Sequence, residues 1–196
     1  MHKHTILSIG CNRKLAKDIG ILNLPEGQTC PGATQLCSTV CYAGKSGRMY
    51  KAARAKRQGN LLLSQDPGFP GALAAEIKAL ELDQVRYHEA GDVYDQAYLA
   101  KLYSVCMATP AVRYLMYTKS FHLDWSGQPG NLARYWSIDK TTRVLPPPGP
   151  TAYLVSKGES PPAGRLTCNH TAAMHYCGSE CRICWDGVAD VYFLQH

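Results

Sequence analysis

Short apolar runs alternate with longer segments of helical spacing along most of the chain. The apolar runs predict strands at 5–10, 85–89, 112–118, 132–138, 152–156 and 191–194, with a short piece near 165–167. Helical spacing predicts helices near 47–64, over 72–82 and over 94–108. Strands that alternate with helices over short connections favour an α/β fold with parallel strands.

We therefore expect a single α/β domain over residues 1–196, built as a partial or distorted (β/α) barrel. It should contain about six to seven mainly parallel strands. The later connections are too short for full helices, so the second half should be irregular. The run LPPPGP at 145–150 predicts a rigid loop and does not separate two compositions. Functional groups of such folds gather where the strands end, so the cysteine-rich loops are expected at the barrel mouth.

The composition is that of a folded protein without a membrane span. Apolar residues make up 45% of the chain, and no apolar run approaches about 18 residues. The first residues lack an apolar secretion signal, so we expect a cytoplasmic location, where thiols stay reduced. Nine cysteines cannot all pair within one chain, which favours metal ligation over disulfides.

Seven of the cysteines form two groups. The first group is Cys30, Cys37 and Cys41, and the second group is Cys168, Cys177, Cys181 and Cys184. Thiolates suit zinc and iron–sulfur clusters alike. The six-residue gap after Cys30 is wide for zinc, which usually takes two short Cys pairs. A [4Fe–4S] cluster is therefore expected, with zinc as the alternative. The spacing leaves open whether there is one cluster or two. Further ligands could come from Cys11, His170 and His175.

Several motifs resemble the phage gene product 88 family. They are TCPGATQLCSTVCYA, VRYHEAGD, RYLMYTKS, CRICW and VYFLQH. This resemblance implies a cysteine-bound iron–sulfur cluster and, for a phage-encoded protein, the cytoplasm of a host cell. A weaker likeness links the chain to the radical S-adenosylmethionine core, through a strand, a three-cysteine loop and a second strand that ends in EAGD. The cysteine spacing and the missing Gly-Gly-Glu differ from that core.

Three residues at predicted strand ends are candidates for catalysis. Asp92 could act as a base, bind a ligand amine or cap the helix that begins near Tyr94. His88 is expected to point into the barrel with Arg86, as a general acid or base. Lys119 could offset the charge of a cluster, bind an anion or act as a nucleophile. The remaining candidates, for cofactor binding, are Tyr42, Glu89 and Ser137.

Three functions fit these features. The first is an enzyme that uses the cluster at the barrel mouth, and the second is a hydrolase of esters or amides with a structural cluster. The third is a noncatalytic redox carrier or sensor. A small-molecule substrate is the expected partner and a membrane is not. The net charge of +6 is concentrated in 45–57, but no set of stacking aromatics accompanies it, so nucleic acid is the weaker alternative. The sequence does not indicate the oligomeric state.

Overall fold

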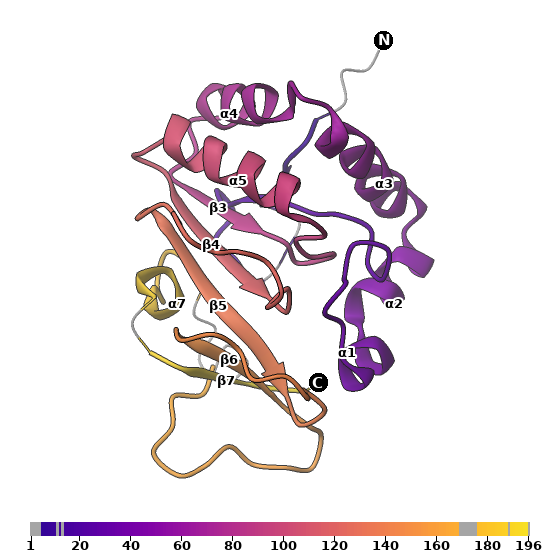
Figure 1. Cartoon of the computed structure of the whole chain (residues 1–196), viewed down its shortest axis with the longest axis vertical. Coiled ribbons are helices and arrows are strands. Elements are labelled where there is room, and N and C mark those ends of the chain that lie inside the picture. Colours follow the sequence, from indigo (N-terminus) through magenta and orange to yellow (C-terminus); the bar gives the residue numbers. More distant parts are fainter. Residues whose placement is uncertain (1–4, 11, 13, 169–175, 188, 196) are drawn as a thin grey trace.

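The chain folds into a mixed α/β structure around one seven-stranded sheet. The computed structural model describes residues 5–10, 12, 14–168, 176–187 and 189–195. The strands follow the chain order from one edge of the sheet to the other (Figure 1). They are β1 (Ser8–Ile9), β2 (Gly20–Leu22), β3 (Gln84–Tyr87), β4 (Arg113–Thr118), β5 (Leu132–Asp139), β6 (Thr151–Val155) and β7 (Val191–Leu194). All neighbouring pairs are parallel except β1 and β2.

The sheet is open and does not close into a barrel. Its two edge strands are β1 and β7, which do not pair with each other in the described part of the chain. β1 pairs antiparallel with β2, with Ser8 opposite Ile21 and Ile9 opposite Gly20. The predicted parallel order of the strands is thus confirmed, and barrel closure is not observed. β2 itself was not predicted, because a strand of three residues is too short to show a period.

Helices α3, α4 and α5 cover one face of the sheet (Figure 1). The described helices are α1 (Gln35–Val40), α2 (Tyr42–Met49), α3 (Lys51–Gln65), α4 (Phe69–Ala79), α5 (Gln96–Ala108) and α7 (Ile183–Asp186). The helix predicted near 47–64 is therefore interrupted at Tyr50, and α1 inside the first cysteine loop was not expected. In the part of the chain that the structure describes, no helix is long and apolar enough to cross a membrane.

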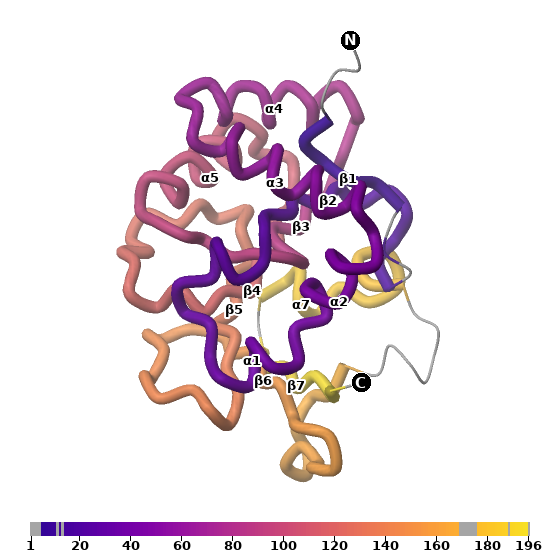
Figure 2. The backbone as a smooth tube through the Cα atoms, turned by 90° about the vertical axis from the view of Figure 1, so that its right-hand side faces the viewer, coloured from indigo at the N-terminus to yellow at the C-terminus, as the bar shows by residue number. Residues whose placement is uncertain are grey.

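The opposite face is covered by α7 and by the segment 15–19. The buried side chains on this face include Leu15, Ile21, Leu115, Tyr135 and Trp185. α7 lies near the beginning of the strands, whereas α1 and α2 lie where the strands end (Figure 1). Figure 2 views the molecule from the side of α1 and α2, and α1 lies over the region where β6 and β7 are labelled. The second cysteine group thus lies on this face of the sheet, whereas the first group lies where the strands end.

Candidate functional site

The loop that leads to the first cysteine group packs directly on the residues that follow β3 and β4. The amide of Asp92 donates to the carbonyl of Thr29 at 3.1 Å. The backbone at Gly32 lies so close to Lys119 that a Cβ there would be 2.0 Å from the Lys119 carbonyl oxygen. Any side chain at Gly32 would push this loop away from the strand ends, so close packing explains the glycine.

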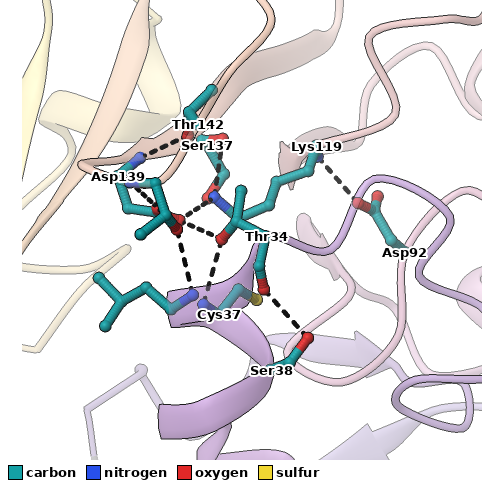
Figure 3. Close-up of polar contacts among 10 residues, drawn as sticks. Thr34, Cys37, Ser38, Asp92, Lys119, Ser137, Asp139 and Thr142 are labelled. Atoms are coloured by element: carbon teal, nitrogen blue, oxygen red, sulfur yellow. Dashed lines mark hydrogen bonds and ion pairs between the residues drawn. The ribbon is translucent and has the colours of Figure 1, made fainter.

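The beginning of α1 is attached to the end of β5. Thr34 is the N-cap of α1, where its Oγ1 accepts a hydrogen bond from the amide of Cys37 at 3.1 Å. The same hydroxyl donates to Oδ2 of Asp139 at 2.5 Å (Figure 3). The amide of Leu36 donates to Oγ1 of Thr141 at 3.1 Å. These contacts fix the helix that carries Cys37 over the carboxyl end of β5.

Lys119 and Asp139 form a buried ion pair beside this helix (Figure 3). Nζ of Lys119 lies 2.8 Å from Oδ2 of Asp139, and the two side chains are 9% and 0% exposed. Nζ also donates to the carbonyl of Ser137 at 3.1 Å, so Ser137 contributes its backbone to this contact. Burial alone would raise the pKa of Asp139, but hydrogen bonds from Lys119, Thr141 and Thr34 outweigh it and lower the pKa to about 2.

Asp92 is buried next to this ion pair and receives three hydrogen bonds. They come from Oγ1 of Thr118 at 2.7 Å, the amide of Lys119 at 2.8 Å and the amide of Val93 at 2.7 Å. Burial nevertheless raises the pKa of Asp92 to about 6. The expected capping role is wrong, because the N-cap of α5 is Asp95. Asp92 instead ties the end of β3 to the end of β4.

The three thiols of the first group are close enough to affect one another. Burial raises the pKa of Cys30 to about 12, and Asp92, Cys37 and Cys41 add to the effect. The pKa of Cys37 is raised mainly by burial and is opposed by the positive charge of Lys119. Within the described residues, no three Cys, His, Asp or Glu side chains already converge as a metal-binding group. Metal binding at these thiols would therefore displace protons and require the side chains to turn toward one another.

The second cysteine group lies on the face of the sheet opposite α3, α4 and α5. Cys177 and Cys181 face each other in a tight turn, in which the amide of Gly178 donates to the carbonyl of Cys181 at 2.8 Å. Cys184 lies on α7 and is buried in the core of this face. Burial raises the pKa of Cys184 to about 11, and Cys177 and Cys168 contribute further. Cys177 thus interacts electrostatically with each of the other three thiols of the second group.

A partly buried arginine faces the second cysteine group. Arg86 lies on β3 with its guanidinium 4.7 Å from the ring centre of Tyr117. Its Nε has no hydrogen-bond partner among the described residues. Burial raises the pKa of Cys177, and Trp185 and Arg86 oppose that rise. Arg86 therefore provides a positive charge on the face of the sheet where the thiols of the second group lie.

His88 does not lie where the strand pattern predicts. Its Nε2 lies 2.9 Å from the hydroxyl of Tyr98 on α5, and its ring stacks on Tyr87. β3 ends at Tyr87, and His88 has a φ of 39°, which breaks the alternation of the strand. The expected position beside Arg86 is therefore wrong. Burial lowers the pKa of His88 to about 3, so its ring stays neutral.

Tyr42 and Glu89 are brought together, but through the backbone of Glu89. The hydroxyl of Tyr42 donates to the carbonyl of Glu89 at 2.5 Å. The carboxylate of Glu89 accepts a hydrogen bond from the side-chain amide of Asn12. This contact links the start of α2 to the end of β3. Cys11, His170 and His175 lie outside the described residues.

Sequence reasoning missed three residues of this site: Gly32, Thr34 and Asp139. Asp139 directly follows the strand predicted over 132–138, so the strand-end rule that led to Lys119 applies to it as well. A threonine before a helix is a known capping signal, although α1 itself was not predicted. Nothing in the sequence indicates the contact between Gly32 and Lys119.

Comparisons with known proteins identify the family of this chain. A family model described as Gene product 88 matches residues 6–187. The Gene 88 protein of Mycobacterium phage L5 is 31% identical over 212 aligned residues, which cover 89% of this chain and 87% of that protein. The Gene 88 protein of Mycobacterium phage D29 is 30% identical over 141 residues, covering 62% and 58% respectively. No solved structure matches the chain. The chain therefore belongs to the gene product 88 family.

Proposed function

We propose that this protein is an enzyme that holds a [4Fe–4S] cluster on the first cysteine group and acts at the carboxyl ends of β3, β4 and β5. The observation that carries the proposal is the docking of the three-cysteine loop on the buried pair of Lys119 and Asp139. Parallel α/β sheets place their functional groups at this end of the strands. A buried ion pair at the ends of the strands would hold the side chain of Lys119 in position before a ligand binds.

The donor set of the first group suits a cluster. Soft thiolates are the ligands that iron–sulfur clusters take from proteins. Cys37 lies on α1 and Cys41 is the residue at its end, so a spacing of four residues places both on one side of the helix. The ammonium of Lys119 lies near Cys37 and offsets negative charge there. A cluster bound by three cysteines supplies redox or Lewis-acid chemistry through the iron that the protein leaves free.

Two neighbouring groups are suited to handle a substrate there. Asp92, with a pKa raised by burial to about 6, can take up or release a proton close to neutral pH. Lys119 holds a fixed position through Asp139 and the carbonyl of Ser137, so it can orient an anionic group without first being ordered. Both residues are connected to the cysteine loop, so the cluster and these side chains would share one rigid support.

The test is the metal content of protein purified without oxygen. We expect iron and acid-labile sulfide, with a visible spectrum that the variant Cys37→Ser weakens or loses. The matched control is Cys106→Ala, because Cys106 lies on the buried side of α5 and belongs to neither group. Stoichiometric zinc without sulfide would contradict the proposal and favour the zinc alternative. An unchanged spectrum in Cys30→Ser, Cys37→Ser and Cys41→Ser would contradict it as well.

A second measurement separates the enzyme from the other functions. Reduced protein is offered ester, amide and S-adenosylmethionine substrates without oxygen, and the products are analysed. Turnover that disappears in Cys37→Ser supports a cluster-dependent enzyme. Turnover that survives removal of the cluster would point to a hydrolase with a structural cluster. A reversible midpoint potential without any turnover would point to a redox carrier.

A further inference from the structure

Helices α2 and α3 carry an exposed basic surface directly after the first cysteine group. We define the α2–α3 basic surface as Lys45, Arg48, Lys51 and Arg54, all of which are exposed. Residues 27–65 contain no aspartate or glutamate at all. Arg57, the next arginine along α3, is instead buried and pairs with Glu26 at 3.0 Å. Arg57 therefore has an internal ion pair, whereas the four residues of the α2–α3 basic surface point their charges toward solvent.

A hollow of about 530 Å³ runs along this surface. Its lining residues are Gly47, Arg48, Lys51, Arg54, Ala55 and Gln58. The lining holds three cationic side chains and no carboxylate. None of the four residues of the α2–α3 basic surface forms an ion pair with an acidic residue in the described part of the chain. Convergent, unpaired cations of this kind attract a ligand with several negative charges.

Large, flat or flexible side chains are exposed on the same two helices. Tyr42 is 57% exposed, Met49 is 71% exposed and Tyr50 is 60% exposed. Tyr50 lies at the junction of α2 and α3, between the cations of the two helices. The hydroxyl of Tyr42 is held by the backbone of Glu89, which leaves its ring fixed at the surface. Two exposed tyrosines thus belong to the same segment of the chain as the cations, although neither lines the hollow itself.

We propose that the α2–α3 basic surface binds single-stranded nucleic acid, with phosphates on Arg48, Lys51 and Arg54 and bases on Tyr50 and Tyr42. Cations along a groove with adjacent exposed rings are the arrangement by which proteins hold single strands with little sequence preference. An acidic peptide would use the cations but would gain nothing from stacking on tyrosine rings. The stretch of α3 from Lys51 to Gln58 spans roughly 10 Å, enough for a short length of backbone. This inference stands apart from the cluster proposal, because none of these residues is a thiol.

The test is fluorescence anisotropy with a labelled single-stranded DNA, and with the RNA of the same sequence, of about 12 nucleotides. The triple variant Arg48→Glu, Lys51→Glu and Arg54→Glu should weaken binding at least about tenfold, since three phosphate contacts give a log–log salt slope of about −2. The matched control is Lys78→Glu, Arg143→Glu and Lys157→Glu, which changes the net charge equally at exposed positions elsewhere. The control should bind nearly as well as the unmodified protein.

The tyrosines are tested separately, on the same probe. Tyr50→Ala should weaken binding about fivefold or more through loss of stacking and leave the salt slope unchanged, while Tyr50→Phe should bind normally. Cys37→Ser should also bind normally, which separates this inference from the cluster proposal. The proposal is overturned if both triple variants weaken binding equally, if poly-glutamate competes as well as unlabelled DNA, or if no binding occurs at low salt.

Discussion

Replacing Lys119 by methionine should destabilise the protein far more than a usual surface substitution. Methionine keeps most of the aliphatic chain but removes the ammonium that lies 2.8 Å from Asp139. Asp139 would then be a buried carboxylate held only by its hydroxyl and amide donors. Breaking one side of a buried ion pair costs about 3–5 kcal/mol.

The pKa of Asp139 gives a second estimate of the same interaction. The shift from 3.8 to about 2 corresponds to about 2 kcal/mol at neutral pH. Part of that shift comes from Thr34 and Thr141, which the variant keeps. Taking the two estimates together, we expect Lys119→Met to lose about 3 kcal/mol, or about 6–12 °C in melting temperature for a chain of this size.

The assay is urea unfolding followed by circular dichroism, with Lys140→Met as the control. Lys140 also pairs with a carboxylate at 2.8 Å, but that pair with Glu159 is about half exposed. An exposed pair contributes only about 0–1 kcal/mol. If Lys119→Met unfolds at the same urea concentration as Lys140→Met, the argument from burial is refuted.

The pH dependence supplies an independent check. Because the folded pKa of Asp139 is lowered, its contribution to stability is present above about pH 4 and is lost as the pH falls toward about 2. In Lys119→Met this pKa should move back up, so the acid-induced loss should become smaller. An identical loss between pH 4 and pH 2 in both proteins would mean that Lys119 does not hold the pKa down.

Three further predictions concern neighbouring positions. Gly32→Ala should lower the free energy of unfolding by about 1–3 kcal/mol, because its Cβ would meet the Lys119 carbonyl oxygen at 2.0 Å. Gly130→Ala is the control and should cost little, because a Cβ there would lie in open space, so equal losses in the two variants would contradict the close packing at Gly32. The side-chain carboxyl carbon of Asp92 should titrate with a midpoint near pH 6 by NMR, and a midpoint near 4 would contradict the effect of burial. Because the pKa of Asp92 is raised in the folded protein, the free energy of unfolding should fall as the pH rises from about 4 to 6. The ring of His88 should show no protonation between pH 5 and pH 8 by NMR, and a midpoint in that range would mean that the ring is accessible to water.

Much of the fold could be predicted because local pattern and tertiary position agree. Strands β3 to β7 are apolar runs bounded by polar or turn residues, and each was predicted to within a residue or two. The break between α2 and α3 at Tyr50 could not be predicted from the sequence, because no proline lies there. The pairing of β1 with β2 joins two short segments of little periodicity. Whether the sheet closes depends on pairing between the distant edge strands β1 and β7, so the local pattern could not settle closure.

Some residues of the candidate site could likewise be predicted from local pattern, and others could not. Asp92 and Lys119 follow strands, and the strand-end rule is sufficient to select them. The hydrogen bond between Thr34 and Asp139 joins residues 105 positions apart, which no local pattern indicates. His88 was placed on the wrong face because alternation was continued one residue beyond the end of β3. Its positive φ is a backbone property that a histidine in a sequence does not reveal.

The strand order has a consequence for how the protein is assembled. Because each strand pairs with the next one along the chain, the sheet can grow during synthesis without waiting for distant partners. The support for the first cysteine group is complete once Asp139 and Thr141 have emerged. The second group is different, because Cys177 pairs with residues at the beginning of the chain, through Lys14 and Ala16. This contact joins segments near the two ends of the chain, so the support for the first cysteine group can form before the second group has been made.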